Sequence, residues 1–302
     1  MKKIKFLLLL FLALMLVGCQ KQTSDISDLE EEISITVPQG TPFIAVGNLM
    51  GSNNLTIEPV SGAAGVKTAL IEGKSDIVIA PLNLGAQLYN KGNSKYELSA
   101  VIGFGNTYVI SKKNIQLSSI QDLNGKKILA YSQGGTPDIV LQYVLNQNNV
   151  SAEIEYMGSV SEVVPFLIQG TYDYVLAAEP VITNIKENKK VELNILNLQD
   201  YIDEKIMQAG IFVNPASEKQ ESIDIVLNSI EKNIKNMNEN VEEYAKELIN
   251  KHVYFSDLTE NILVKSIPNS NLGYMNALEN KAEVEKYLNM INYELPKEEF
   301  YR

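Results

Sequence analysis

Residues 123–150, LNGKKILAYSQGGTPDIVLQYVLNQNNV, contain a short apolar run, a glycine-bearing turn and then apolar residues at helical spacing. The run KKILAY predicts a strand, and SQGGTPD supplies the turn that ends it. The segment that follows the turn predicts an amphipathic helix. A strand, a small turn and a helix in this order are typical of parallel strands joined by right-handed crossovers.

The same order of elements occurs before and after this stretch. Two sets of alternating strands and helices predict two α/β lobes. From Ser217 onward the apolar residues recur at helical spacing, which predicts a helical segment. The earlier segments are ISITV (33–37), FIAVGNLM (43–50), LTIEPV (55–60), VKTALIEG (66–73) and SDIVIAP (75–81). The later segments are NTYVISKKN (106–114), AEIEYMG (152–158), SEVVPFLIQG (161–170, with a helix interrupted or started late by Pro165), YDYVLAAEP (172–180) and a last helix at about 279–292.

The first 18 residues have the composition of a secretory signal. Lys2, Lys3 and Lys5 precede an apolar run from Phe6 to Val17, which is too short to span a bilayer that needs about 20 helical residues. Leu16-Val17-Gly18-Cys19 resembles the bacterial lipobox, in which the cysteine is acylated and becomes the mature N-terminus. The alternative is an ordinary signal with a leftover buried cysteine. Residues 19–32 lack apolar periodicity and predict a flexible tether.

Composition restricts the partners and the chemistry. The formal net charge is -11, and the loss of the three N-terminal lysines would make it more negative, so nucleic acid is not an expected partner. Cys19 is the sole cysteine and His252 the sole histidine. A Cys-His or Ser-His catalytic dyad is therefore not expected, because it needs a base, and a zinc site is not expected, because it needs several nitrogen or sulfur ligands. No metal or cofactor is predicted. We interpret His252 as a surface or helix-capping residue.

Three turns share a composition that suits ligand binding. PQGTP (38–42), SGAAG (61–65) and SQGGTPD (132–138) each contain glycine and precede a predicted helix. Helix starts leave backbone N–H groups unpaired, and ligands of parallel-sheet lobes bind beyond the carboxyl ends of strands. Any strand-to-helix turn needs such residues, so it is the three turns together that indicate a site.

The motifs GKSDIVIAP, SSIQDLNGKKILAYSQGGTPD and FLIQGTYDYVLAAEP, together with the lipobox, resemble the solute-binding lipoproteins of ABC importers. The similar branch comprises binding proteins for aliphatic sulfonates, nitrate, taurine and thiamine precursors. The resemblance covers about 33–212 well and the helical tail loosely. It implies a two-lobed type II periplasmic-binding fold, with a mixed, mainly parallel sheet flanked by helices in each lobe and a helical C-terminal segment.

The resemblance also implies the domain division, the partners and the location. Lobe 1 would comprise 33–107 plus 213–302 and lobe 2 would comprise 108–212, with hinges near Tyr108–Ser111 and Ile211–Pro215. The partners would be a small molecule and the permease and ATPase subunits of an importer. The protein would be a monomer, lipid-anchored to the outer face of the bacterial cell membrane, and would not be an enzyme.

The family's ligand contacts carry over to positions in the turns and at strand ends. Tyr108 and Tyr131 would either stack on a ligand ring or be partly buried at a lobe edge. Glu179 would accept hydrogen bonds from the ligand, pair with a lysine across the lobes, or be exposed. The implied ligand-binding residues are Gln39, Gly40, Thr41, Ser61, Gly62, Pro81, Asn83, Tyr108, Tyr131, Gly134, Gly135, Thr136 and Glu179.

The ligand class is inferred from an absence. Arg302 is the only arginine, and arginine is the usual bidentate partner of phosphate and carboxylate ligands. Tyrosine, amide and carboxylate side chains favour a thiamine-precursor-like pyrimidine or another flat heterocycle. The alternatives are a sulfonate, taurine or nitrate-type anion in the same transport role, or an enzyme or sensor subunit on the same fold, with Glu179 and either Asp138 or Asp173 as the acid–base pair.

Overall fold

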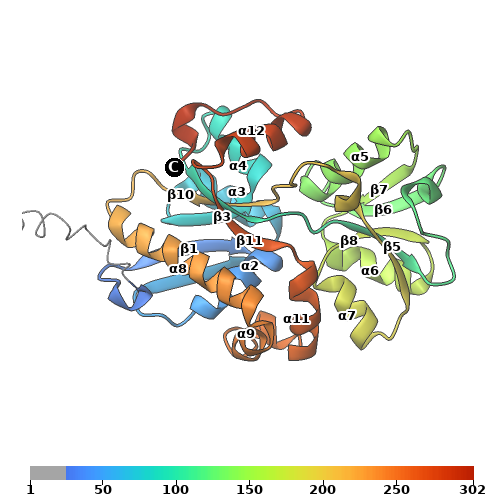
Figure 1. Ribbon diagram of the computed structural model, residues 1–302, viewed down its shortest axis with the longest axis horizontal. Helices are drawn as coiled ribbons and strands as arrows, with labels where there is room; N and C mark the ends of the chain where they lie inside the picture. The colour runs from blue at the N-terminus through green and yellow to red at the C-terminus, as the bar shows by residue number, and fades with distance from the viewer. Residues whose placement is uncertain (1–24) are drawn as a thin grey trace, which may run out of the picture.

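The computed structural model describes residues 25–302, which form two lobes side by side (Figure 1). The predicted signal at 1–18 and the predicted acylation site at Cys19 lie outside the described residues. No helix within residues 25–302 is both long enough and apolar enough to cross a membrane.

Lobe 1 is built on a six-stranded sheet with the order β11-β4-β10-β3-β1-β2. β1 pairs in parallel with β2 and β3, whereas β10 runs antiparallel to β3 and β4, and β11 runs antiparallel to β4. The strands are β1 (Ile33–Pro38), β2 (Leu55–Val60), β3 (Ile77–Pro81), β4 (Glu97–Gly103), β10 (Ala209–Val213) and β11 (Leu272–Asn276).

Helices cover both faces of the lobe 1 sheet. Ile77 and Ile79 of β3 pack in the cluster that includes α2, α8 and α9, while Val78 and Ala80 pack in the cluster that includes α3, α4 and α12. This alternation explains why the strand is apolar throughout its centre. The α-helices are α2 (Thr41–Val46), α3 (Gly62–Glu72), α4 (Leu82–Asn90), α8 (Gln220–Glu239), α9 (Val241–Leu248), α10 (Val253–Ser256), α11 (Glu260–Ser266) and α12 (Lys281–Met290).

Lobe 2 is built on a five-stranded sheet with the order β7-β6-β8-β5-β9. β6 pairs in parallel with β7 and β8, and β5 is antiparallel to β8 and β9. The elements are β5 (Tyr108–Lys112), β6 (Lys127–Tyr131), α5 (Thr136–Gln147), β7 (Glu153–Met157), α6 (Val160–Gln169), β8 (Tyr174–Ala177), α7 (Val181–Asn188) and β9 (Leu193–Asn197). The 3-10 helices of both lobes are η1 (Ile26–Asp28), η2 (Gly47–Leu49), η3 (Ile120–Leu123), η4 (Leu198–Tyr201), η5 (Ile267–Asn269) and η6 (Glu298–Phe300).

The predicted α/β class is confirmed. Each sheet is mixed, most of its described strands point in one direction, helices flank it, and the C-terminal segment is helical.

Pro165 neither interrupts nor delays the helix α6, because Pro165 is the sixth residue of a helix that continues to Gln169. The helix ends at Gly170, which has a left-handed backbone conformation.

The chain crosses between the lobes at 104–107 and at 198–208. These segments differ from the predicted hinges, because Tyr108–Ser111 are strand residues of β5 and Ile211–Val213 are strand residues of β10. The predicted boundary at residue 212 also falls within β10, which is hydrogen-bonded to β3 and β4 in lobe 1. All five residues of β10 are buried, and such a pattern does not reveal which sheet the strand joins.

Part of the predicted tether packs against lobe 1. Asp25 caps η1, and the Leu29 side chain is buried in the core. The Asn54 side-chain amide donates to the Leu29 carbonyl at 2.7 Å. The packed body therefore begins several residues before Ile33.

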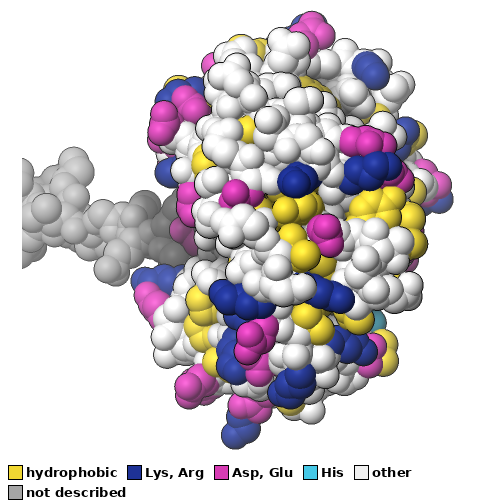
Figure 2. Space-filling model, turned by 90° about the vertical axis from the view of Figure 1, so that its right-hand side faces the viewer, with side chains coloured by type: hydrophobic (Ala, Val, Ile, Leu, Met, Phe, Trp, Pro, Cys, Tyr) yellow, Lys and Arg dark blue, Asp and Glu magenta, His cyan; other side chains and the backbone are white. Residues whose placement is uncertain are grey.

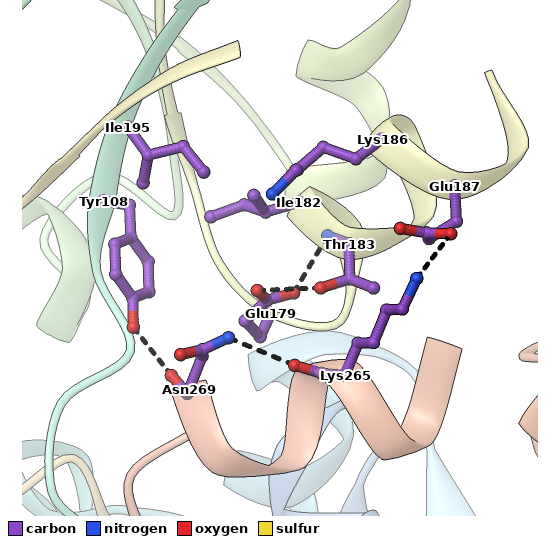
Figure 3. Close-up of a pocket in the computed structure, with 9 residues that line it drawn as sticks. All are labelled: Tyr108, Glu179, Ile182, Thr183, Lys186, Glu187, Ile195, Lys265 and Asn269. Carbon is purple, nitrogen blue, oxygen red and sulfur yellow. Dashed lines mark hydrogen bonds and ion pairs between the residues drawn. The ribbon is translucent and has the colours of Figure 1, made fainter. Parts of the chain in front are cut away.

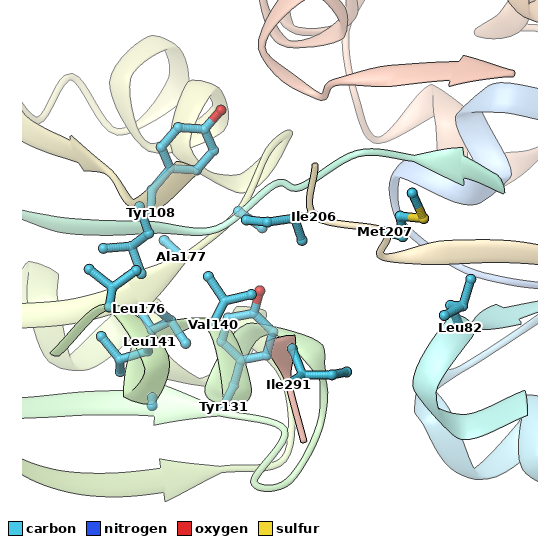
Figure 4. Packing of buried hydrophobic residues seen from close by; sticks show 14 of the residues in the cluster. Leu82, Tyr108, Tyr131, Val140, Leu141, Leu176, Ala177, Ile206, Met207 and Ile291 are labelled. Atoms are coloured by element: carbon cyan, nitrogen blue, oxygen red, sulfur yellow. The ribbon is translucent and has the colours of Figure 1, made fainter. Parts of the chain in front are cut away.

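An apolar cluster continues from one lobe to the other through the second crossing segment. Figure 4 shows Ile206 and Met207 between Tyr131 of lobe 2 and Leu82 of lobe 1. Ile206 and Met207 are both buried.

The outer end of lobe 2 is different: there, acidic and basic side chains are interspersed around exposed apolar atoms (Figure 2).

Candidate ligand-binding site

The carboxyl ends of the parallel strands of both sheets face a shared cleft. A cavity of about 210 Å³, here called the central cavity, is lined by residues that follow β1, β2 and β3 in lobe 1 and β6 and β8 in lobe 2. This is the location expected for a ligand in open α/β sheets. The cavity is smaller than the roughly 300–1,000 Å³ typical for drug-sized ligands, so it suits a small guest.

The lobe 1 wall consists of two turns that lead into helices. Gln39, Gly40 and Thr41 precede and begin α2, and Gly62 and Ala63 begin α3. Gly40 (φ 111°) and Gly62 (φ 66°) have left-handed backbone conformations that favour glycine. No side chain caps α3, so its first N–H groups remain available beside the cavity.

The lobe 2 wall contains the SQGG turn. Ser132 (φ 54°) and Gly134 (φ 74°) both have left-handed backbone conformations. The N-cap residue of α5 is Gly135, which has no side chain to cap the helix. The Gly134 N–H donates to the Asp138 carboxylate at 2.7 Å, so one donor of the turn is already paired. Asp138 also accepts from Tyr156 and Gln142, which gives this buried carboxylate a role in holding the loop.

Glu179 follows β8 and is the single acidic residue that lines the central cavity among the described residues. Its carboxylate accepts hydrogen bonds from the Thr183 N–H and hydroxyl, each at 3.0 Å. Burial raises the pKa of the Glu179 carboxyl, against the opposing effects of the Thr183 donors and the Lys186 charge. Asn106 fixes the Glu179 backbone through bonds at 2.8 and 3.0 Å.

The lysine pairing considered for Glu179 is made by a different residue. Glu187 of α7 forms the ion pair across the lobes, with Lys265 of α11 at 2.9 Å. Asn261 also donates to the Glu187 carboxylate, at 3.1 Å. Hydrogen bonds from Lys265 and Asn261 lower the pKa of Glu187.

The two candidate tyrosines lie in different cavities. Tyr131, at the end of β6, lines the central cavity and is 7% exposed. Tyr108 instead lines a cavity of about 310 Å³ on the other side of Glu179, here called the Lys186 cavity. The Tyr108 hydroxyl donates to the Asn269 carbonyl at 2.6 Å, and burial raises the pKa of Tyr108 to about 12.

Asn83 and Thr136 are bonded to one another. The Thr136 hydroxyl donates to the Asn83 side-chain oxygen at 3.1 Å, across the lobes. Asn83, Gly134 and Gly135 line a third cavity of about 450 Å³, here called the Asn83 cavity, which shares Gly62 and Pro81 with the central cavity. Of the predicted residues, Ser61 and Thr136 line none of these three cavities.

Sequence reasoning missed Asn106 and Gln208, which also line the central cavity. They lie on the two crossing segments, outside any turn between a strand and its helix. Their one sequence signal is a polar side chain beside a strand end, Asn106 before β5 and Gln208 before β10. That signal is common to many surface loops.

Among the described residues, no lysine, arginine or histidine lines the central cavity. Arg302 lies elsewhere, where its guanidinium contacts Gln220 and pairs with Asp224 of α8 at 2.7 Å. The C-terminal tail therefore does not bring its guanidinium into the cleft. His252 caps α10, because its Nδ1 accepts from the Tyr254 N–H at 3.1 Å, as predicted.

A family model described as NMT1/THI5 like matches residues 52–243. No curated protein matches the chain. Solved structures match its fold, among them an ABC transporter protein from Parabacteroides distasonis, with 21% identity, a TM-score of 0.75, and coverage of 90% of this chain and 99% of that chain.

Two further structures are similar in fold. A ligand-binding component of an ABC-type import system from Staphylococcus aureus, with zinc bound, has 14% identity, a TM-score of 0.69 and coverage of 90% of this chain and 97% of that chain. The alkanesulfonate-binding protein SsuA from Xanthomonas axonopodis pv. citri, bound to MOPS, has 14% identity, a TM-score of 0.64 and coverage of 88% and 94%. The two-lobed periplasmic-binding fold expected from the sequence is thereby confirmed.

Proposed function

Since the chain belongs to the NMT1/THI5-like family, we propose that it is the extracytoplasmic solute-binding protein of an ABC importer. It captures a small molecule between its two lobes and delivers it to a permease that is coupled to an ATPase. The observation that carries this proposal is the central cavity, whose walls come from the strand ends of both lobes. A ligand that contacts both walls stabilises the closed form over the open form, and this difference drives closure.

The ligand we propose is a thiamine-precursor-like aminopyrimidine or another flat heterocycle. Glu179 presents carboxylate oxygens that accept hydrogen bonds from an amino group, while the start of α3 offers N–H donors to a ring nitrogen or hydroxyl. The Tyr131 ring provides an aromatic surface in the same cavity. A guest with both donors and acceptors matches this combination.

A small sulfonate, taurine or nitrate-type anion is the second candidate. The uncapped starts of α3 and α5 favour it, because helix N-termini attract anions. The buried carboxylate of Glu179 opposes it. The absence of any lysine, arginine or histidine among the described lining residues leaves this carboxylate unbalanced within the central cavity. We therefore place the heterocycle first.

We propose further that the protein acts as a monomer and that an acyl anchor on Cys19 holds it at the outer face of the bacterial cell membrane. One acyl chain gives only reversible membrane binding, so lasting attachment needs a second chain. The anchored protein should shift to a soluble fraction when Cys19 is replaced by serine, with ligand affinity unchanged. Retention of the C19S protein in the membrane fraction would contradict the anchor.

A thermal-shift panel tests the transport ligand. Thiamine precursors, alkanesulfonates, taurine, nitrate and flavins are each added to the purified protein at high concentration. A ligand at about 100 times its dissociation constant adds roughly 2.7 kcal/mol of stability, which is readily seen as a rise in melting temperature. We expect the aminopyrimidine to give the largest shift, with no product formed on long incubation. A shift produced solely by a sulfonate would overturn the ligand assignment, and turnover would overturn the transport role.

A further inference from the structure

The Lys186 cavity lies beside the central cavity and shares only Glu179 with it. Its volume is about 310 Å³, and Figure 3 shows it between α7 of lobe 2 and the α11–η5 segment of lobe 1. Lys265 and Asn269 come from lobe 1, whereas the other lining residues come from lobe 2. The cavity is therefore complete only when the lobes are closed.

One side of the Lys186 cavity is apolar. Tyr108, Ile182 and Ile195 face it (Figure 3). Ile195 is 40% exposed although it is a large apolar side chain in the strand β9. Apolar surface left beside a cavity favours a guest that covers it.

The charged groups of the cavity leave one cation without a partner. Lys265 pairs with Glu187 at 2.9 Å, and the Glu179 carboxylate accepts two hydrogen bonds from Thr183. Figure 3 shows no hydrogen bond or ion pair between the Lys186 ammonium and the other lining residues. Lys186 is close enough to Glu179 to oppose the rise in that carboxyl's pKa.

We propose that the Lys186 cavity is a second ligand site, which binds a small organic monoanion with a flat or branched apolar body. The carboxylate pairs with the Lys186 ammonium, and the apolar body packs on Ile182, Ile195 and the Tyr108 ring. A single negative charge fits, because Lys265 already pairs with Glu187 and only Lys186, of the lysines that line the cavity, is left to pair with an anion. A dianion would meet repulsion from Glu179 and Glu187.

Occupation of this site favours the closed form, because lobe 2 supplies the residues that hold the anion, while Lys265 and Asn269 of lobe 1 complete the wall around it only when the lobes are together. Any guest that binds only the closed form also raises the affinity of the central cavity for its own ligand, and the coupling is reciprocal. The proposal does not depend on which molecule fills the central cavity, and it can be tested without that molecule.

Benzoate and its neutral analogue benzamide are suitable probes, with binding measured by calorimetric titration of the full chain. We expect benzoate to bind at least fivefold tighter than benzamide. The K186M variant, which keeps most of the apolar stem, should lose this preference. The control is K189M, since Lys189 ends the same helix, is exposed and does not line the cavity.

Two further variants place the probe. I195N should weaken benzoate and benzamide to a similar extent, because it removes apolar contact without changing charge. Q39A, which removes a lining side chain of the central cavity without adding bulk between the lobes, should leave benzoate binding unchanged. Equal affinity for the two probes, retention of the preference in K186M, or loss of benzoate binding in Q39A would each overturn the proposal.

Discussion

The Thr136 hydroxyl at the start of α5 donates to the Asn83 side-chain oxygen of α4 at 3.1 Å, and both side chains are buried. This hydrogen bond joins lobe 2 to lobe 1 beside the central cavity. Both residues are predicted ligand contacts, and in this structure they contact each other. We infer that their role in capture is to stabilise closure, with the ligand bound next to them.

Replacement of Thr136 by valine keeps the shape of the side chain and removes this bond. The buried Asn83 oxygen is then left without its donor, which costs about 1–3 kcal/mol, so ligand affinity should fall by about tenfold. The loss should appear mainly as faster dissociation in stopped-flow measurements, because closure is weakened while encounter is not. The exposed residue Thr171 provides the matched control, T171V. An unchanged dissociation rate in T136V would show that the bond has no part in closure.

Glu179 should make stability depend on pH with a sign opposite to that of most carboxylates. Burial raises the pKa of its carboxyl above the ordinary value of 4.5, so the folded state holds the proton more tightly than the unfolded state does. At pH values above the raised pKa, the ionised Glu179 carboxylate therefore lowers the free energy of unfolding. This loss of stability disappears as the pH falls below 4.5. E179Q should raise the melting temperature at pH 7 and have no such effect in acid, as followed by circular dichroism.

The same substitution should weaken binding of an amino-bearing ligand at pH 7, so Glu179 would be retained for function at a cost in stability. D173N, on an exposed loop, is the control. An E179Q protein that is less stable than wild type at pH 7 would show that the charged form is favoured by the fold.

Arg302 should contribute to stability and not to ligand binding. Its ion pair with Asp224 is largely on the surface, where such pairs contribute about 0–1 kcal/mol. We expect R302M to lower the melting temperature slightly and to leave ligand affinity unchanged in calorimetry. A loss of affinity for an anionic ligand in R302M would instead place the tail in the cleft.

Gly85 allows α4 to pack closely on β10. A Cβ atom built on Gly85 would lie 2.1 Å from the Phe212 ring, and Phe212 is fully buried. G85A should therefore destabilise the protein by about 1–3 kcal/mol, since overpacked cores force side chains and backbone to shift. The double variant G85A/F212L, which makes room at the contact, should recover part of the loss. Additive losses in the double-variant cycle would contradict direct packing between the two residues.

The sequence was most informative where one pattern determined one element. The strands at 33–38, 55–60 and 127–131, the glycine turns after them and the helices that follow were all predicted close to their observed positions. These elements make up much of the central cavity, whose lining includes Gln39, Gly62 and Tyr131; the resemblance to solute-binding proteins predicts these residues as ligand contacts. In these segments local periodicity and turn chemistry agree.

The remainder depends on contacts between distant parts of the chain. β4 and β10 were not predicted, because their pairing joins residues 97–103 to residues 209–213, far apart in sequence. For the same reason Asn106 and Gln208 were missed at the cavity and the crossing segments were placed too late. Closure contacts such as Tyr108 with Asn269 arise from tertiary packing, which a single sequence does not encode locally.

The central claim is that the cavity between the lobes binds a small heterocycle with an amino group, which Glu179 recognises. Calorimetric titration of the wild-type protein with an aminopyrimidine thiamine precursor, and separately with an alkanesulfonate, tests it most directly. The account predicts saturable binding of the aminopyrimidine at a single site, and no displacement of the aminopyrimidine by the sulfonate. Tight binding of the sulfonate with none of the aminopyrimidine would contradict it.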